Sequence, residues 1–473
     1  MKRHYKNIFL LSLTLIFAKI PVNAAEDQVR SLKAPGYWQL YTRDIFNLRT
    51  NPFVVFEKYF NQFGKKGDPV NIWIPFMKNI YIFSHPKDLK EIFEQEKEGK
   101  LIKGSIINDV QRYLLGDGVA SIEPSYSERN STIYHQLLPL YAEYFYPAKF
   151  ALYRVIIENW SREFLDHMDK EIQKGQIDIE KLSLNFTMGI ICRTMFGYPI
   201  MPDESDKIGE HLTVILNHIQ YKMLNRPFVL PDSISLFGNS DYQASIQQVE
   251  EFIDKLWNYN RDYTLLPKYF IDLIKESNFE ESVKRDQIKN VFFGGHETTA
   301  HLVAMSIYRL INHPEIAKKL SVEITKNDKY LDSFLHEVLR LDSPISIYGR
   351  DTTEEITINS ITIPANSTIL FAQHWSHRLE EFWENPEEFN PDRFLTKDLR
   401  RPMDSFYPFG LGQRKCLGKY LALFETKTFL QEFMKKASYL TWKVPANWSP
   451  KVRMQCTSRI EGGIPMCLEN AQE

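Results

Sequence analysis

The sequence predicts a mainly α fold of the α+β class, in which a large helical domain carries small β-sheets. Three observations support this fold class. Apolar residues recur every three or four positions, the helical period, through most of residues 85–330. Short runs of alternating β-branched residues lie on both sides of that region. The chain has 473 residues, 43% of them hydrophobic, which is enough apolar material for a large core.

The first 24 residues have the pattern of a targeting segment. Three cations precede an apolar run at residues 8–18, and small residues suited to cleavage follow at 22–24. We therefore expect residues 1–24 to be a secretory signal peptide, which would make the protein exported or periplasmic. The alternative is a short N-terminal anchor, which would make it membrane-associated. The apolar run is shorter than the roughly 20 residues of a spanning helix, which favours the signal peptide.

The helical region begins after a short β region. Residues 70–83 alternate apolar and polar side chains, which predicts a two-stranded hairpin. Residues 152–164 and 249–259 are among the clearest helical stretches. The helical period fails at residues 226–239, where prolines and a glycine interrupt a segment that is still apolar. We expect this segment to be either a surface crossover packed on its own side chains or a lid over a substrate channel.

Two more β regions are expected in the last third of the chain. β-Branched residues alternate between turns through residues 356–371, which predicts a small β meander. A turn at residues 461–463 divides residues 452–468 into two runs, which predicts a second hairpin. If the protein is exported, Cys456 and Cys467 would lie symmetrically about this turn and could form a cross-strand disulfide.

Charge and cysteine spacing exclude several classes of function. The 58 basic and 60 acidic residues are interleaved and give a net charge of −2, so nucleic-acid binding has no electrostatic support. The four cysteines show no CxxC spacing, which argues against a zinc cluster and against a disulfide framework.

The most informative segment surrounds Cys416. Residues 409–418 read FGLGQRKCLG, a loop of glycines and cations around one cysteine, ahead of a helix predicted from residue 417 to about 434. Glycines let the backbone fold tightly and approach a flat cofactor, while Arg414, Lys415 and the helix N-terminus favour the ionised thiol. Such a thiolate suits haem iron, because it donates electron density that favours O–O cleavage. The alternative is an ordinary buried cysteine, which behaves as a small hydrophobe.

These residues resemble the haem-binding signature of the cytochrome P-450 family. The matching Phe, Gly, Arg, Cys and Gly are Phe409, Gly412, Arg414, Cys416 and Gly418. The resemblance implies that Cys416 is the axial ligand of a haem b iron, that Phe409 shields its sulfur and that Arg414 points at a haem propionate. It also implies a haem domain over residues 35–473, with the haem between an oxygen-binding helix and the cysteine loop.

A second match lies upstream of this loop. Glu337 and Arg340 are three residues apart on a predicted helix, a pair that exposed helices also carry for a few tenths of a kcal/mol. About 50 residues later, residues 389–394 resemble the family's Arg-containing meander. The resemblance implies a buried ion network of Glu337, Arg340 and Arg393, in which the loss of one member would leave a buried charge unpaired.

A third match lies in the long helix predicted over residues 286–311. Gly294 and Gly295 are poor helix formers, each costing about 1 kcal/mol relative to alanine, and either a porphyrin passing close by or a helix–helix contact would explain them. The segment resembles the family's oxygen-binding helix. The resemblance implies that Thr298 steadies iron-bound oxygen and that Glu297 feeds protons to it. His296 could be a distal ligand, but we expect a structural hydrogen-bonding residue.

Two further residues are expected at the haem propionates. Arg350 occupies the position at which the family places a propionate-binding arginine, although a surface arginine is the alternative. Upstream of residues 136–139 the family has a tryptophan, which is absent here, and a basic residue four positions later. Either Tyr134 or His135 stands at that basic position, and His135 is our candidate.

The resemblance implies a haem-dependent monooxygenase that inserts one atom of O2, its co-substrate, into a small apolar molecule such as a fatty acid, terpenoid or sterol-like compound. No flavin, nicotinamide or iron–sulfur motif occurs, so we expect a separate electron-transfer protein: a ferredoxin, a flavodoxin or a flavoprotein reductase. A basic face for docking that donor, or else an ordinary solvated surface, would comprise Lys397, Arg400, Arg401, Lys415 and Lys419.

Two other functions stay open. One is a peroxide-using or isomerising haem-thiolate enzyme, which would need neither Glu297 nor Thr298, so the presence of both argues against it. The other is a haem-binding sensor or carrier without turnover, for which the same two residues would be dispensable.

Overall fold

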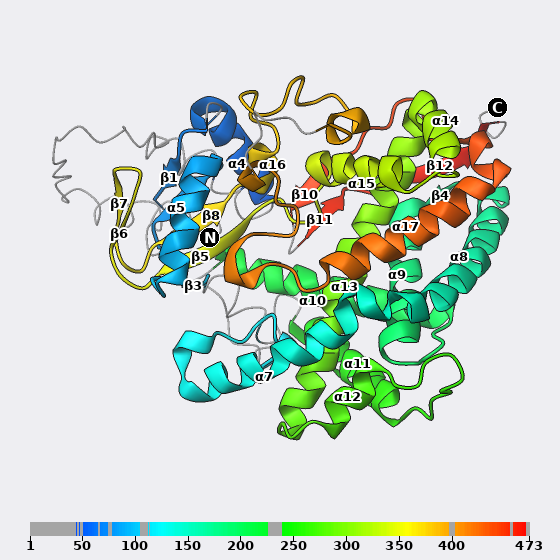
Figure 1. The fold of residues 1–473 in the computed structure, drawn as a ribbon, viewed down its shortest axis with the longest axis horizontal. Coiled ribbons are helices and arrows are strands. Elements are labelled where there is room, and N and C mark those ends of the chain that lie inside the picture. Colours follow the sequence, from blue (N-terminus) through cyan, green and yellow to red (C-terminus); the bar gives the residue numbers. More distant parts are fainter. Residues whose placement is uncertain are drawn as a thin grey trace, which may run out of the picture. The chain divides into compact units, whose positions relative to one another are not determined.

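The computed structural model in Figure 1 describes most of the chain. The described residues are 44, 47, 51–64, 67–73, 78–104, 112, 114–225, 239–396, 403–454 and 457–469. All of them belong to one compact unit, Lys33–Glu473. The predicted targeting segment lies outside the described residues, and so does the predicted lid or crossover at 226–239 except for Asn239, which begins α11. The remaining predicted positions Lys397, Arg400, Arg401 and Cys456 also lie outside the described residues.

Helices dominate the described part of the chain, as predicted. They are α4 (Pro52–Tyr59), α5 (Pro86–Lys97), α7 (Glu128–Phe145), α8 (Phe150–Gln173), α9 (Ile179–Met195), α10 (Pro202–Asn225), α11 (Asn239–Asn258), α12 (Phe270–Glu276), α13 (Glu281–Asn312), α14 (Pro314–Glu323), α15 (Lys329–Leu341), α16 (Gln373–Ser376) and α17 (Lys419–Lys435). Among the described residues, no helix combines the length and the hydrophobicity needed to cross a bilayer.

The strands form small sheets, also as predicted. They are β1 (Val70–Ile72), β2 (Ile80–Phe83), β3 (Leu101–Lys103), β4 (Ile177–Asp178), β5 (Tyr348–Thr352), β6 (Ile356–Ile358), β7 (Ile361–Ile363), β8 (Thr368–Phe371), β9 (Trp442–Lys443), β10 (Val452–Met454), β11 (Ser458–Ile460) and β12 (Pro465–Leu468). The largest sheet has the order β1-β2-β8-β5-β3. The hairpin predicted at residues 70–83 is confirmed, because β1 and β2 pair antiparallel with Val70 opposite Ile82.

The predicted β meander is only partly correct. Strands β6 and β7 form a hairpin of their own, but β8 pairs with β2 and β5 instead of β7. The burial patterns explain the difference. All four residues of β8 are buried, which suits an interior strand with neighbours on both edges, whereas β6 and β7 alternate buried and exposed residues.

The predicted C-terminal hairpin is wrong. Strand β11 pairs with β10, while β12 crosses to another sheet and pairs with β4 and β9. The turn between β11 and β12 directs this crossing. Gly463 has a φ of +74°, and a Cβ there would lie 2.1 Å from the carboxylate of Asp178, which accepts a hydrogen bond from the next backbone N–H. Cys467 therefore lies opposite Lys443, so the hairpin on which the predicted disulfide rested does not form.

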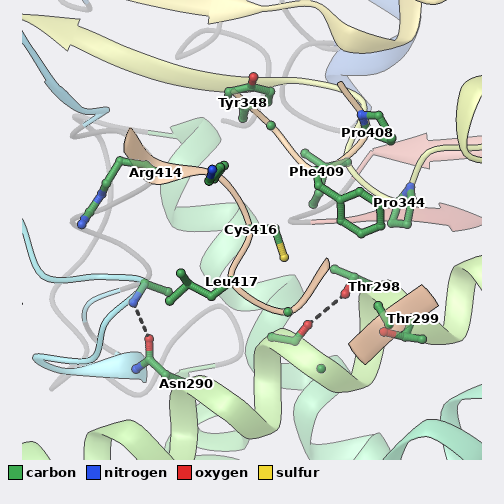
Figure 2. A pocket seen from close by; sticks show the side chains of 18 of the residues that line it. Asn290, Thr298, Thr299, Pro344, Tyr348, Pro408, Phe409, Arg414, Cys416 and Leu417 are labelled. Carbon is green, nitrogen blue, oxygen red and sulfur yellow. Dashed lines mark hydrogen bonds between the residues drawn. The ribbon is translucent and has the colours of Figure 1, made fainter. Parts of the chain in front are cut away.

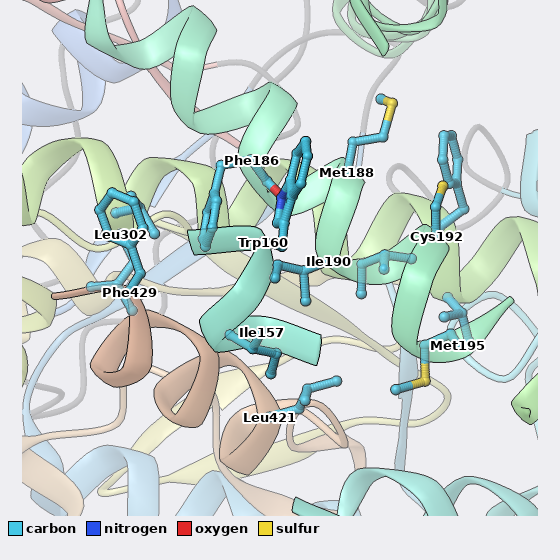
Figure 3. Close-up of a cluster of buried hydrophobic side chains, with 14 of the residues drawn as sticks. Ile157, Trp160, Phe186, Met188, Ile190, Cys192, Met195, Leu302, Leu421 and Phe429 are labelled. Carbon is cyan, nitrogen blue, oxygen red and sulfur yellow. The ribbon is translucent and has the colours of Figure 1, made fainter. Parts of the chain in front are cut away.

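A dense aromatic core joins helices from distant parts of the sequence. Figure 3 shows Trp160 of α8, Phe186 of α9, Leu302 of α13 and Phe429 of α17 packed together. The rings of Phe186 and Phe429 are 4.5 Å apart, and the indole N–H of Trp160 donates to the carbonyl of Phe186 at 2.9 Å. This packing fixes α13 and α17 relative to each other, and these two helices border the cavity described below.

The predicted ion network is confirmed. Arg340 donates from Nε and Nη2 to the two oxygens of Glu337 at 2.8 and 2.9 Å, and both side chains are fully buried. Arg393 donates to the same carboxylate at 3.0 Å. Arg340 also donates to the carbonyls of His377, Pro386 and Glu388. The network therefore ties α15 to residues 377–393, which lead toward the cysteine loop.

Candidate functional site

The loop that presents Cys416 is shaped by close contacts with α5. The backbone N–H of Cys416 donates to the carbonyl of Phe409 at 2.9 Å. Gly412 has a φ of +74°, and a Cβ at this position would lie 2.0 Å from a carboxylate oxygen of Glu96. The same oxygen accepts from the backbone N–H of Gln413 at 3.2 Å. Gly412 is therefore required both for its conformation and for its contact with α5.

The environment of the Cys416 sulfur both opposes and supports ionisation. Burial raises the pKa of the thiol, while the backbone N–H groups of Gly418 and Lys419 and the ammonium of Lys419 lower that pKa. The predicted help from the helix N-terminus is thus confirmed, since α17 begins at Lys419. The predicted help from Arg414 and Lys415 is wrong, because the cation that acts on the sulfur is Lys419. Gly418 sits in ordinary contact with this sulfur, its Cβ position being 3.8 Å away.

A cavity of about 430 Å³ separates the cysteine loop from α13. Figure 2 shows Cys416 and Thr298 facing this space, with Phe409 beside the sulfur, and all three side chains line the cavity. Much of the remaining wall is apolar, including Val119, Phe145, Val291, Leu302, Ile345 and Ile347. The arrangement predicted from the sequence, a cysteine loop opposite the middle of a long helix, is therefore present.

The two glycines of α13 lie in different surroundings, so the absence of a side chain has a different reason at each. A Cβ on Gly294 would meet nothing within 4 Å, which leaves the cavity open at this point. A Cβ on Gly295 would lie 2.5 Å from the side chain of Ile191 on α9. The helix–helix contact considered from the sequence therefore explains Gly295, and the close passage of a porphyrin stays a prediction for Gly294. The helix is continuous here, and the hydroxyl of Thr298 donates to the carbonyl of Gly294 at 2.9 Å.

The neighbours of Thr298 point elsewhere. Glu297 is buried and does not line the cavity; its carboxylate contacts Nη2 of Arg459 at 2.6 Å. His296 is also outside the lining and stacks on Phe292, with ring centroids 6.1 Å apart. Burial and the charge of Arg459 lower the pKa of His296 to about 3. His296 thus occupies a structural position, and its carbonyl accepts from the hydroxyl of Thr187 at 2.8 Å.

Three cations gather at one edge of the cavity. Arg350 and Arg414 line it as predicted, and Lys103, which the sequence did not single out, lines it with them. Arg350 donates to Glu96 at 2.6 Å. Arg414 donates from Nη2 to the carbonyl of Ile122, but its buried Nη1 has no hydrogen-bond partner among the described residues.

The charge balance of this edge fits a bound anion. Burial, followed by the charges of Arg414 and Arg350, lowers the pKa of Lys103 to about 7. A cation in this state and an unpartnered guanidinium nitrogen would both be stabilised by nearby carboxylates. The two propionates of a haem would supply these carboxylates, and Cys416 would supply the axial sulfur. The residues present therefore fit a haem.

The prediction for His135 is wrong. Its side chain is exposed and does not line the cavity, whereas the alternative, Tyr134, lines it and packs under the guanidinium of Arg414 at 4.5 Å. One residue on a helix turns the side chain by about 100°, so a shift of one position decides which side chain faces inward. The missed Lys103 lies opposite Arg350 in the β3–β5 register, a pairing that the sequence does not reveal.

A second missed residue is Glu425 on α17. Glu425 lines the cavity, and one of its carboxylate oxygens is buried without a hydrogen-bond partner among the described residues. Burial raises its pKa well above the usual value, and a hydrogen bond with Thr299 acts in the opposite direction. The sequence offered one signal that Glu425 could face the cavity. This residue lies nine positions after Cys416, on the inner face of the following helix.

Comparison with known proteins agrees with this geometry. A protein-family model described as Cytochrome P-450 matches residues 45–445. The chain therefore belongs to the cytochrome P-450 family, whose members are haem-containing monooxygenases, and it is an oxidoreductase of that class.

Individual relatives are distant. The chain is 26% identical to mouse cytochrome P-450 3A16 over 340 residues, which cover 63% of this chain and 67% of the relative. It is 24% identical to probable cytochrome P-450 4aa1 of Drosophila melanogaster over 85% of this chain and 82% of the relative. Some other matches cover less than two thirds of the relative, such as 63% of mouse cytochrome P-450 3A11.

A solved structure supports the fold. The crystal structure of the cytochrome CYP175A1 from Thermus thermophilus superposes with a TM-score of 0.72 at 20% identity, covering 93% of this chain and all of that chain. At this level of identity the likeness establishes the fold alone, which is the fold predicted from the sequence.

Proposed function

We propose that this protein inserts one atom of O2 into a C–H bond of a small apolar molecule, using two electrons from a separate protein. The other oxygen atom leaves as water after taking up two protons. The observation that carries the proposal is the placement of Cys416 and Thr298 across one largely apolar cavity, with Lys103, Arg350 and Arg414 among the cations that line it. Haem b, when bound, supplies the iron at which oxygen is activated.

The residues of the chain have distinct tasks in this proposal. Cys416 would bind the iron through its sulfur, beside which Phe409 lies. Arg350, Arg414 and Lys103 would hold the propionates, whose negative charge would offset the positive charge of the cavity edge. The backbone N–H groups of Gly418 and Lys419 favour the thiolate and so act against burial, which raises the pKa of the Cys416 thiol.

Protons reach the oxygen side through α13. The hydroxyl proton of Thr298 is donated to Gly294, so the lone pairs of Oγ1 are left to accept a hydrogen bond in the cavity. Glu297 is the adjacent carboxylate, and we assign to it the transfer of protons toward this hydroxyl. The open face of Gly294 leaves space in the cavity beside Thr298.

The class of substrate is inferred from the cavity wall, and the class of electron donor from charged residues on the surface. The apolar wall favours a fatty acid, a terpenoid or a sterol-like molecule. Lys415 and Lys419 are exposed beside the thiolate and would attract an acidic donor of the ferredoxin, flavodoxin or flavoprotein-reductase type. Charge reversal at both should slow reduction, and the same change at Lys435, at the far end of α17, should not. Equal rates would contradict this docking face.

Location in the cell is proposed from the sequence alone. Residues 1–24 either direct export to an extracytoplasmic compartment or anchor the protein to a membrane. Mass spectrometry of the N-terminus of protein purified from each cell fraction distinguishes the two. A mature chain beginning near residue 25 supports export, and an intact chain in the membrane fraction supports the anchor.

The central test is spectroscopic. The reduced protein treated with carbon monoxide should show the red-shifted Soret band of thiolate-ligated haem, and Cys416→Ser should lose it. Cys192→Ala, which removes a buried sulfur in α9, is the matched control and should keep the band. If Cys416→Ser keeps the band, the assignment is wrong.

Turnover is tested at Thr298. Thr298→Ala should lower the product formed per reducing equivalent, and Thr298→Ser, which keeps a hydroxyl, should restore most of it. If Thr298→Ala and Thr298→Ser both form as much product as the wild type, a peroxide-using or isomerising enzyme is favoured. If neither the wild type nor any variant forms product, a sensor or carrier is favoured.

A further inference from the structure

Three consecutive residues of β11 contact three different parts of the molecule. The backbone N–H of Ser458 donates to the carbonyl of Pro344 at 2.7 Å, and its hydroxyl lies 2.8 Å from that of Ser346. Pro344 lines the cavity. The backbone N–H of Ile460 donates to Glu180 of α9 at 3.2 Å. Strand β11 is therefore held at a defined place between the cavity wall and α9.

Arg459 lies between Ser458 and Ile460, and its side chain contacts α13. Its Nε and Nη2 lie 2.7 and 2.6 Å from one oxygen of Glu297. One turn further along α13, His301 lies 3.9 Å from Glu180, the residue that binds Ile460. Residues 297 and 301 share a face of the helix, whereas Thr298 is turned about 100° from Glu297. The acid and the threonine thus face different surroundings, and the acid faces β11.

The geometry of this ion pair differs from that of the structural network. Arg340 binds both oxygens of Glu337, and both side chains are completely buried. Nε and Nη2 of Arg459 both contact a single oxygen of Glu297, and the side chains of Arg459 and Glu297 are 16% and 8% exposed. A two-oxygen fork fixes a carboxylate, whereas a single-oxygen contact leaves it able to turn about its own axis. The pair suits a carboxylate that must be placed and still exchange a proton.

We propose that Arg459 is a positioning residue for the reaction, which holds the Glu297 carboxylate on the β11 side of α13 at a place set by the contacts of β11 with the cavity wall. This inference rests on the proposed role of Glu297 as the proton carrier. A merely structural pair that fastens β11 to α13 is the competing explanation, and it predicts loss of stability without a specific effect on turnover.

The test compares four single variants and one double variant of the haem-loaded full chain, with an electron donor and a substrate found by spectral titration. Arg459→Met removes the cation, Arg459→Lys keeps it, and Glu297→Gln removes the acid. The matched control is Arg453→Met, which removes an exposed arginine directly opposite Arg459 in the β10–β11 register. The measurements are kcat, KM, product per reducing equivalent, and the urea midpoint of unfolding.

We expect Glu297→Gln and Arg459→Met to lower kcat and product per reducing equivalent by about tenfold with unchanged KM, somewhat less than the full contribution of a positioned proton donor. Arg459→Lys should recover most of the loss, and Arg453→Met should match the wild type. In the double variant Arg459→Met with Glu297→Gln, the loss should not exceed that of Glu297→Gln alone, because the arginine acts through the acid.

The outcomes separate the inference from the proposed function. If Glu297→Gln turns over normally, the role of Glu297 fails and the inference fails with it. If Glu297→Gln is impaired while Arg459→Met is normal, only the inference is overturned. If Arg459→Met and Arg459→Lys lower the urea midpoint and turnover equally, the pair is structural and the inference is again overturned.

Discussion

The buried network of Glu337, Arg340 and Arg393 gives the sharpest stability prediction. In Arg340→Met the carboxylate of Glu337 loses two charged hydrogen bonds and, among the described residues, keeps Arg393 and the backbone N–H of Asn390. The carbonyls of His377 and Pro386 lose the guanidinium donor at the same time, and that of Glu388 keeps a hydrogen bond from Arg393. Nothing can replace these partners, because both Glu337 and Arg340 have no exposed surface.

The expected magnitude follows from this burial. Removing one member of a buried ion pair costs about 3–5 kcal/mol. Unfolding entropy is about 2.1 cal/mol/K per residue, so for a unit of this size the midpoint of thermal unfolding should fall by about 3–5 °C. The double variant Glu337→Leu with Arg340→Met should lose less than Arg340→Met alone, because two apolar side chains leave no unpaired charge.

The assay is thermal unfolding followed by circular dichroism at fixed pH and salt. Arg162→Met is the matched control. The side chain of Arg162 is 55% exposed and lies 3.6 and 3.3 Å from Glu158 and Glu432, so a loss below about 1 kcal/mol is expected. The reasoning is refuted if Arg340→Met unfolds within about 1 °C of the wild type. It is also refuted if the double variant loses the sum of the two single losses.

Three further predictions follow from the cavity. When haem binds near pH 8, Lys103 should take up a proton because propionates raise its pKa from about 7, while Cys416 releases its thiol proton, so Lys103→Met should shift the net proton change toward release, as measured in buffers of different ionisation enthalpy. Glu425 has a raised pKa, so the folded state binds more protons than the unfolded state above pH 4.5; stability should fall as pH rises from there, and Glu425→Gln should flatten that dependence in urea unfolding. Gly412→Ala should lower haem retention on a desalting column, whereas Gly209→Ala, at a position with open space around it, should not.

The sequence predicted what short motifs encode. The cysteine loop, the long glycine-containing helix and the Glu337 network each depend on residues whose spacing and type are visible in the chain. Arg350 and Arg414 were found in the same way, and both line the cavity.

The errors came from relations between distant segments. Strand pairing decides that β8 lies between β2 and β5, that β12 leaves β11 and that Lys103 lies opposite Arg350, and none of these pairings is local. His135 was chosen over Tyr134 because a helical register was off by one residue. Glu425 was missed because burial, not a motif, gives it its chemistry.

Glu96 has a consequence for how the protein matures. Its two carboxylate oxygens bind Arg350 and the backbone of Gln413, so one side chain near the start of the chain closes both the propionate edge and the thiolate loop. During synthesis Glu96 leaves the ribosome long before Arg350 or Gln413 has been made. These two contacts can therefore form only after Gln413 has left the ribosome, and the site for the cofactor cannot close before then.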